Sequence, residues 1–159
     1  MQSFAIAATV ATIASASASD FPRFDAMHAN CAMAVTYQNW SCDTLQTMMD
    51  YEIRSWANGG PSGGLYAIYE ESEGDHYIWS TRTTPVAKYV DDQIFQFTQD
   101  GSDCNVAAKS RSQTKSYYDY DTNYCNMWNV FTELGSFTNL STSDCQWVPS
   151  DAVATCAIY

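Results

Sequence analysis

Six cysteines constrain the fold of this chain more than any other feature. They lie at Cys31, Cys42, Cys104, Cys125, Cys145 and Cys156. An even number of cysteines in a short secreted chain indicates a disulfide framework, so we expect three disulfides. No Cys-x-x-Cys occurs, and neither His28 nor His76 has zinc-ligand spacing to a cysteine pair. We therefore expect no structural metal, and nothing in the sequence indicates a cofactor.

The N-terminal segment indicates secretion. Its first 19 residues contain no charged side chain, and the apolar run Phe4–Ala14 is too short for a membrane helix, which takes about 20 residues. Ala16-Ser17-Ala18 has the small-x-small pattern of a signal-peptidase site. We expect residues 1–18 to be a signal peptide and residues 20–159 to form one domain, which is extracellular or in the secretory-pathway lumen. The alternative is a disordered tail rich in Ala, Ser and Thr.

Two sequons and the charge balance suit this compartment. Asn39 and Asn139 each begin an Asn-x-Ser sequon, which predicts glycosylation. The net charge of −11, from 18 acidic and 7 basic residues, disfavours nucleic acid and anionic lipid as partners. No later segment is long and apolar enough to span a membrane. The acidic surface serves solubility, or it attracts cations.

Hydrophobic periodicity predicts two helices. Residues 40–56 place Leu45, Met49 and Ile53 on one face, and Ser41 is suited to cap this helix. A second helix is expected to begin at Asp121 or Thr122 and to end near Gly135.

Four strand-like segments lie between the two predicted helices. They are Leu65–Glu70, Tyr77–Thr83, Asp92–Thr98 and Asn105–Ser112. Short polar turns join them in two pairs, and Asp100-Gly101 is a strong hairpin signal. We therefore predict an α+β fold with an N-terminal helix, a four-stranded antiparallel sheet of two hairpins, a C-terminal helix and a disulfide-stapled tail. The pairings Cys104–Cys125 and Cys145–Cys156 would suit this order.

Three motifs between residues 89 and 123 resemble one known family. An aromatic-Val-Asp-Asp-x-x-Phe strand, a Ser-x-Ser strand and a Tyr-x-Asp…Asn segment correspond to the pattern of the DUF1499 family, whose function is unknown. The matching positions are Val90, Asp91, Asp92, Phe95, Ser110, Ser112, Tyr117, Asp119 and Asn123. Asp121 stands where the family usually has Gly, and Gln113 replaces an Arg. The resemblance supports the α+β interpretation and implies no established activity.

The same motifs have a structural interpretation. Asp91 and Asp92 begin the third predicted strand, and Lys109 and Arg111 lie on the fourth, so acidic and basic groups are expected to pair across the hairpin. Farther along the chain, Asp119-x-Asp121-x-Asn123 copies part of a calcium loop, but Tyr124 occupies its required glycine position. For Asp119 and Asn123, capping of the second helix is the preferred role.

The sequence contains no complete catalytic constellation. It has no Gly-x-Ser-x-Gly elbow, and Asp91 and Asp92 are expected to point to opposite faces of a strand. The alternative that stays open is a small hydrolase-like enzyme that uses Asp92, Asp119 and His76.

Tyrosines beside acidic residues favour binding instead. We predict a non-enzymatic binding or assembly module whose partner is a protein, a glycan or a small molecule. The predicted binding residues are Asp92, Arg111, Tyr117, Tyr118, Asp119, Tyr120 and Asn123.

Overall fold

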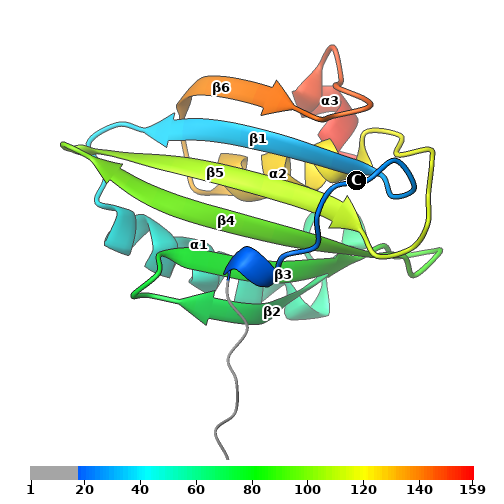
Figure 1. The fold of residues 1–159 in the computed structure, drawn as a ribbon, viewed down its shortest axis with the longest axis horizontal. Coiled ribbons are helices and arrows are strands. Elements are labelled where there is room, and N and C mark those ends of the chain that lie inside the picture. Colours follow the sequence, from blue (N-terminus) through cyan, green and yellow to red (C-terminus); the bar gives the residue numbers. More distant parts are fainter. Residues whose placement is uncertain (1–17) are drawn as a thin grey trace, which may run out of the picture.

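The computed structural model describes residues 18–159, which are built around one six-stranded antiparallel sheet (Figure 1). The predicted signal peptide, apart from Ala18, lies outside the described residues. The strands are β1 (Asn30–Tyr37), β2 (Leu65–Ser72), β3 (Tyr77–Thr83), β4 (Val90–Asp100), β5 (Asp103–Ser112) and β6 (Thr138–Ser143). The α-helices are α1 (Cys42–Ser55), α2 (Thr122–Glu133) and α3 (Ala152–Cys156), and short 3-10 turns span Ala18–Asp20 (η1), Trp56–Asn58 (η2) and Pro61–Gly63 (η3).

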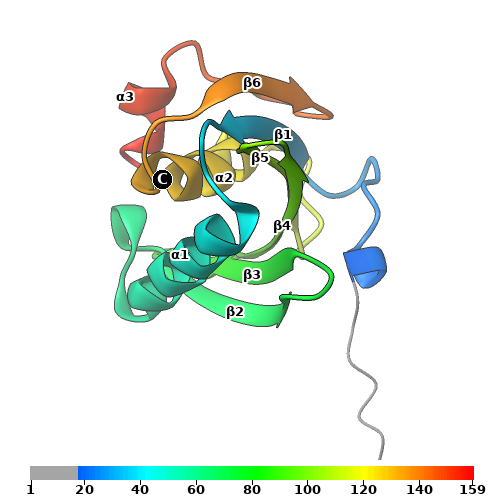
Figure 2. The ribbon, with the colours of Figure 1, turned by 90° about the vertical axis from the view of Figure 1, so that its left-hand side faces the viewer.

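The sheet has a helix-covered face and an open face. Its strand order is β2-β3-β4-β5-β1-β6, and α1 and α2 both pack against the same side (Figure 2). The main core lies in this layer, where Leu45 and Met49 of α1 and Phe131 of α2 meet Phe95 of β4. Burial of these apolar side chains is the main force that holds helices and sheet together.

The predicted four-stranded sheet with a helix before it is wrong. An additional strand, β1, precedes α1 and pairs with β5 on one side and β6 on the other. Its alternation of buried and half-buried residues includes small alanines on the outer side, so the apolar contrast along β1 is weak. Every residue of β6 is exposed, so that strand has no hydrophobic period. The sheet has six strands, and the fold is dominated by β-structure.

The individual central elements agree with the sequence pattern. Ser41 caps α1, because its Oγ accepts a hydrogen bond from the backbone N–H of Thr44 at 3.2 Å. Strands β2 to β5 pair consecutively as an antiparallel meander. Gly101 has φ +58° in the β4–β5 turn, a left-handed conformation that glycine adopts without steric cost.

An N-terminal segment crosses the open face of the sheet (Figures 1 and 2). Its Phe21 ring makes an edge contact with Trp79, with ring centroids 5.3 Å apart. Tyr77 and Ile94 complete this second, smaller cluster. The segment therefore buries apolar side chains that a bare sheet face would leave in water.

All six cysteines are paired, but not as expected. The disulfides are Cys31–Cys145, Cys42–Cys104 and Cys125–Cys156. The predicted pairs Cys104–Cys125 and Cys145–Cys156 are wrong. The first turn of α2 lies over the end of β5, where Ser110 donates a hydrogen bond to Asn123. Cys104 lies at the other end of β5, roughly 20 Å from Ser110 at the usual rise of a strand.

Two further expectations concern the surface. Within residues 18–159, no helix has the length and apolar character needed to cross a membrane. The sequon residues Asn39 and Asn139 are both exposed, which is a condition for modification, and their glycosylation stays a prediction.

Candidate functional site

A pocket of about 280 Å³ lies at one end of the sheet. It is formed where β3 and β5 end and β4 begins, against the loop before α2 and the first turn of that helix. Buried polar residues form its floor, and exposed tyrosines form its rim. The floor residues are Asp91, Ser112, Asp119 and Asn123, and the rim residues are Tyr89, Tyr117, Tyr118 and Tyr120. We call this site the tyrosine-rimmed pocket.

Asp119 joins the floor to helix α2. Its carboxylate accepts hydrogen bonds from the backbone N–H of Asn123 at 3.1 Å and from the Asn123 side-chain amide at 2.5 Å. Asp119 therefore binds the first turn of α2 as predicted, although the N-cap residue is Asp121 and the other predicted cap, Asn123, lies inside the helix. Asp119 is only 4 % exposed, and burial raises its pKa to about 6, assisted by the negative charge of nearby Asp91.

Asp91 is the second buried carboxyl group of the floor. It is 3 % exposed and accepts a hydrogen bond from Asn126 Nδ2 at 2.9 Å. Burial raises its pKa, although hydrogen bonds from Asn126 and Ser112 and the charge of Arg82 act in the opposite direction. None of the ion pairs within residues 18–159 includes Asp91 or Asp119. The floor therefore holds two buried acids, neither of which forms an ion pair within residues 18–159.

Arg82 lies behind this floor, opposite Asp91 in the β3–β4 register. Its side chain is 1 % exposed, and its Nε and Nη1 have no hydrogen-bond partner among the described residues. On the next strand, burial raises the pKa of Tyr66 to about 12, while the charge of Arg82 opposes that shift. Gly64 leaves room for the guanidinium, because a Cβ atom there would lie 2.7 Å from Arg82 Nε. Position 64 thus requires glycine if Arg82 is to keep this place.

The rim presents aromatic rings to solvent. Tyr117, Tyr118 and Tyr120 are 60–66 % exposed. Tyr118 stacks on Tyr120 at 5.8 Å and meets Tyr117 edge to face at 5.4 Å. These contacts order the rings without burying them, which is a feature of binding surfaces.

The backbone at this rim is strained. Tyr120 and Asp121 both have positive φ, at 51° and 66°. The left-handed region is unfavourable for residues that carry a Cβ, by about 1–2 kcal/mol. Such conformations cluster at functional sites, where surrounding contacts enforce them.

The structure brings together only part of the predicted site. Asp119, Asn123 and the three rim tyrosines of the loop line the pocket, whereas Asp92 and Arg111 do not. Asp92 instead accepts hydrogen bonds from Trp79 Nε1 and Gln113 Nε2, both at 3.1 Å.

The predicted ion pairing across the β4–β5 hairpin is also wrong. Arg111 faces Asp92 in the register, but its Nη2 forms an ion pair with Asp25 at 2.9 Å. Asp25 also contacts His28 Nδ1 at 2.8 Å. Lys109 faces Ile94 and not an acid. The N-terminal segment therefore supplies the partner of Arg111.

Asp25, His28 and Arg111 form what we call the open-face cluster. Hydrogen bonds from His28, followed by Arg111, hold the pKa of Asp25 well below its ordinary value. The Asp25 side chain is 43 % exposed, while Arg111 is 11 % exposed. This cluster thus stabilises a carboxylate in its charged form close to water.

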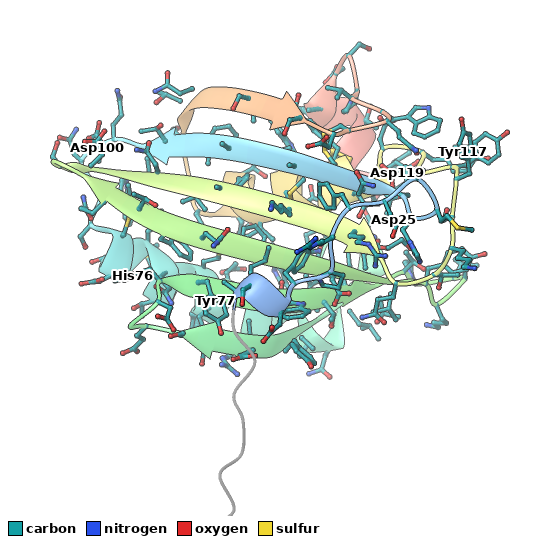
Figure 3. The ribbon with its side chains drawn as sticks, viewed as in Figure 1. Asp25, His76, Tyr77, Asp100, Tyr117 and Asp119 are labelled. Atoms are coloured by element: carbon teal, nitrogen blue, oxygen red, sulfur yellow. A yellow bond between two sulfur atoms is a disulfide. The ribbon has the colours of Figure 1, made fainter. Side chains whose placement is uncertain are left out.

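The residues of the hydrolase alternative lie far apart. His76 is in the β2–β3 turn near Asp43, at the opposite end of the sheet from Asp119 (Figure 3). Asp92 points to the open face, away from the pocket. Among residues 18–159, no three His, Cys, Asp or Glu side chains are grouped to hold a metal ion. The three proposed catalytic groups therefore do not form one site.

Several pocket residues were not predicted from the sequence. Asp91, Ser112 and Tyr89 all line the pocket. Strand alternation separates Asp91 from Asp92, but it does not say which of the two faces the helices. Asp91 and Ser112 are cross-strand partners, so the register of the β4–β5 hairpin places the two residues side by side.

The family comparison covers most of the chain. Residues 11–134 match the family described as Protein of unknown function (DUF1499). The chain belongs to this family. No curated protein gives a significant match.

The DUF1499 motifs converge on the pocket. Five of the nine positions that match the family pattern line it, namely Asp91, Ser112, Tyr117, Asp119 and Asn123. The position that is usually Gly in the family is Asp121 here, and its left-handed φ of 66° explains the glycine. The family motifs therefore build one local structure.

Proposed function

We propose that this DUF1499 protein is a secreted, non-enzymatic binding module whose ligand occupies the tyrosine-rimmed pocket. The observation that carries the proposal is the pocket itself, in which exposed tyrosine rings surround buried, hydrogen-bonded polar groups. Concave sites that combine aromatic walls with a few fixed polar groups are typical of small-ligand binding. The ligand is a small molecule or the terminal group of a glycan or protein.

Secretion belongs to the same proposal. Three disulfides use every cysteine of the chain, and disulfides of this kind persist in oxidising compartments. Removal of residues 1–18 would leave Ser19 at the start of the segment that covers the open face. The mass of the protein purified from its source tests cleavage and also glycosylation at Asn39 and Asn139.

The binding proposal is tested by NMR titration of the disulfide-bonded protein with a panel of sugars, amino acids, amines and nucleosides. We expect at least one class to shift the amide signals of Tyr118 and Asn123. Tyr118→Ala should weaken that binding, whereas Tyr51→Ala should not, because Tyr51 is an exposed tyrosine on α1, outside the pocket. Binding that leaves the pocket signals unchanged, or no binding by any class, contradicts the proposal.

One observation favours catalysis as a second candidate. Asp119 has a pKa raised to about 6 and lies near Asp91, and neighbouring acids with raised pKa values are used in general acid catalysis. The two functions differ in the effect of Asp119→Asn once a ligand is known. In an enzyme, the substitution abolishes turnover but the substrate still binds. A binding module has no turnover to lose.

A further inference from the structure

The charge of the pocket floor is not balanced at short range. Among residues 18–159, the Asp119 carboxylate accepts hydrogen bonds only from Asn123. A buried carboxylate that lacks a cation is unfavourable, because hydrogen bonds replace only part of its lost hydration. A ligand with a positive charge beside Asp119 would supply the missing interaction.

Other charged groups near the pocket do not remove this imbalance. Arg82, on the neighbouring strand β3, offsets part of the charge of Asp91. Arg82 is not among the residues that line the pocket. Asp121 adds negative charge near Asp119. Lys115 is the single cationic side chain among the lining residues, and it is exposed. Its charge is screened by water, so it competes weakly for the buried carboxylate.

The rim supplies a second kind of cation recognition. Four tyrosines line the pocket, and the face of an aromatic ring attracts ammonium and guanidinium groups. Trp147 extends the aromatic surface, with its ring 6.2 Å from that of Tyr118. Several aromatic rings beside a carboxylate form the arrangement that recognises alkylammonium groups.

Two other ligand classes fit less well. A sugar would stack on tyrosine but would leave the charge of Asp119 uncompensated. A bare metal ion prefers several oxygen ligands, and among residues 18–159 no three His, Cys, Asp or Glu side chains are grouped closely enough to hold one. A cavity of about 280 Å³ also has room for an organic molecule.

We infer that the tyrosine-rimmed pocket binds a small organic cation, a quaternary or protonated amine, between the tyrosine rings and the Asp119 carboxylate. This inference rests on the proposed function and specifies its ligand class. The net charge of −11 attracts such ligands at long range and raises their association rate at low salt.

The test compares a cation with its neutral isostere. Choline and 3,3-dimethylbutan-1-ol have nearly the same shape and differ in charge, and cadaverine represents the protonated amines. We expect choline or cadaverine to shift the amides of Tyr118, Tyr120 and Asn123, with the neutral alcohol binding at least about 10-fold more weakly. Equal binding of choline and the alcohol overturns the inference, as does the absence of cation binding up to about 10 mM.

Substitutions then test whether Asp119 supplies the negative charge that binds the cation. Asp119→Asn should weaken cation binding by about 10-fold or more, whereas Asp100→Asn, an exposed acid at the far end of the sheet (Figure 3), should leave it unchanged. Wild-type affinity should fall as the pH drops through about 6, where Asp119 takes up a proton. Thermal unfolding confirms that each variant is folded. Equal loss in both variants, or no loss in either, rules out Asp119 as the counter-ion.

The titrations separate the inference from the function on which it rests. If the pocket amides respond to a sugar or nucleoside but not to cations, the cation inference fails and the binding function stands. If no compound of either panel shifts those amides, both fail.

Discussion

Asp119 and Asp25, which lie on opposite faces of the sheet, have pKa values shifted in opposite directions. On the helix-covered face, Asp119 is buried and forms no ion pair with any of residues 18–159, and burial raises its pKa to about 6. On the open face, Asp25 is partly exposed between His28 and Arg111, and its pKa is lowered. Both lie at the same end of the molecule (Figure 3). Immediate surroundings, and not distance along the sheet, therefore decide which charge state each face stabilises.

This difference separates a structural cluster from a candidate binding site. The open-face cluster pairs its charges internally and ties the N-terminal segment to β5. The covered face instead keeps two acids and Arg82 together beside a pocket, and Nε and Nη1 of Arg82 have no hydrogen-bond partner among residues 18–159. An arrangement that reduces stability persists where a function requires it.

We expect the largest change in the free energy of unfolding from a substitution that fills the space occupied by the Arg82 side chain. Gly64→Ala places a methyl group 2.7 Å from Arg82 Nε, and because the Arg82 side chain is only 1 % exposed, it must shift against its buried neighbours to avoid the clash. We expect a loss of roughly 2–3 kcal/mol in the free energy of unfolding, measured with urea and intact disulfides. Gly74→Ala is the control, because nothing lies within 4 Å of a Cβ there. Equal stability of the two variants would show that Arg82 is not tightly held.

The next effect is the pH dependence of the covered face. The folded pKa of Asp119 is about 6 and its ordinary value is 3.8, so the folded state binds more protons between these values. Stability should therefore fall as the pH rises from about 4 to 6, by roughly 2 kcal/mol from this group. Asp119→Asn should flatten that part of the urea-unfolding profile, and Asp100→Asn should not. An unchanged slope in the Asp119 variant contradicts the assignment.

The open face should respond with the opposite sign. Because the folded pKa of Asp25 lies below 3.8, its contribution is complete above that value and is lost as the pH falls through the folded pKa. Asp25→Asn should lower the melting temperature at neutral pH, and the gap to wild type should close on acidification. Thermal unfolding across pH, with Asp100→Asn as control, measures this. A gap that stays constant shows that Asp25 acts through packing alone.

Local pattern predicted α1, α2 and the central hairpins, because their signals are contained in single segments, whereas the short helix α3 was not predicted. Strand β1 was missed because two of its outward residues are alanines, which weakens the apolar contrast, and β6 because it buries nothing. Within the site, the stretch Tyr117–Asn123 was recognised because it is contiguous. Asp92 was predicted at the site in place of Asp91 because strand alternation does not tell which of the two side chains faces the helices. The true partner of Arg111 lies on a segment 86 residues away. Such choices depend on tertiary register, which a single sequence does not specify.

The smallest effect concerns the strained loop that carries the rim into α2. Asp121 has φ 66° where the family usually has Gly, so Asp121→Gly should relieve steric strain and raise the free energy of unfolding. The gain is about 0.5 kcal/mol, because the added chain entropy of glycine in the unfolded state offsets part of the relief. Asp121→Ala is the matched variant and should lower stability, because Ala tolerates the left-handed region less well than Asp. If Gly is no more stable than Ala in urea unfolding, strain at this residue does not limit the fold. A more stable Gly variant with unchanged ligand affinity would show that the strain comes from the loop path and is not required for binding at the pocket.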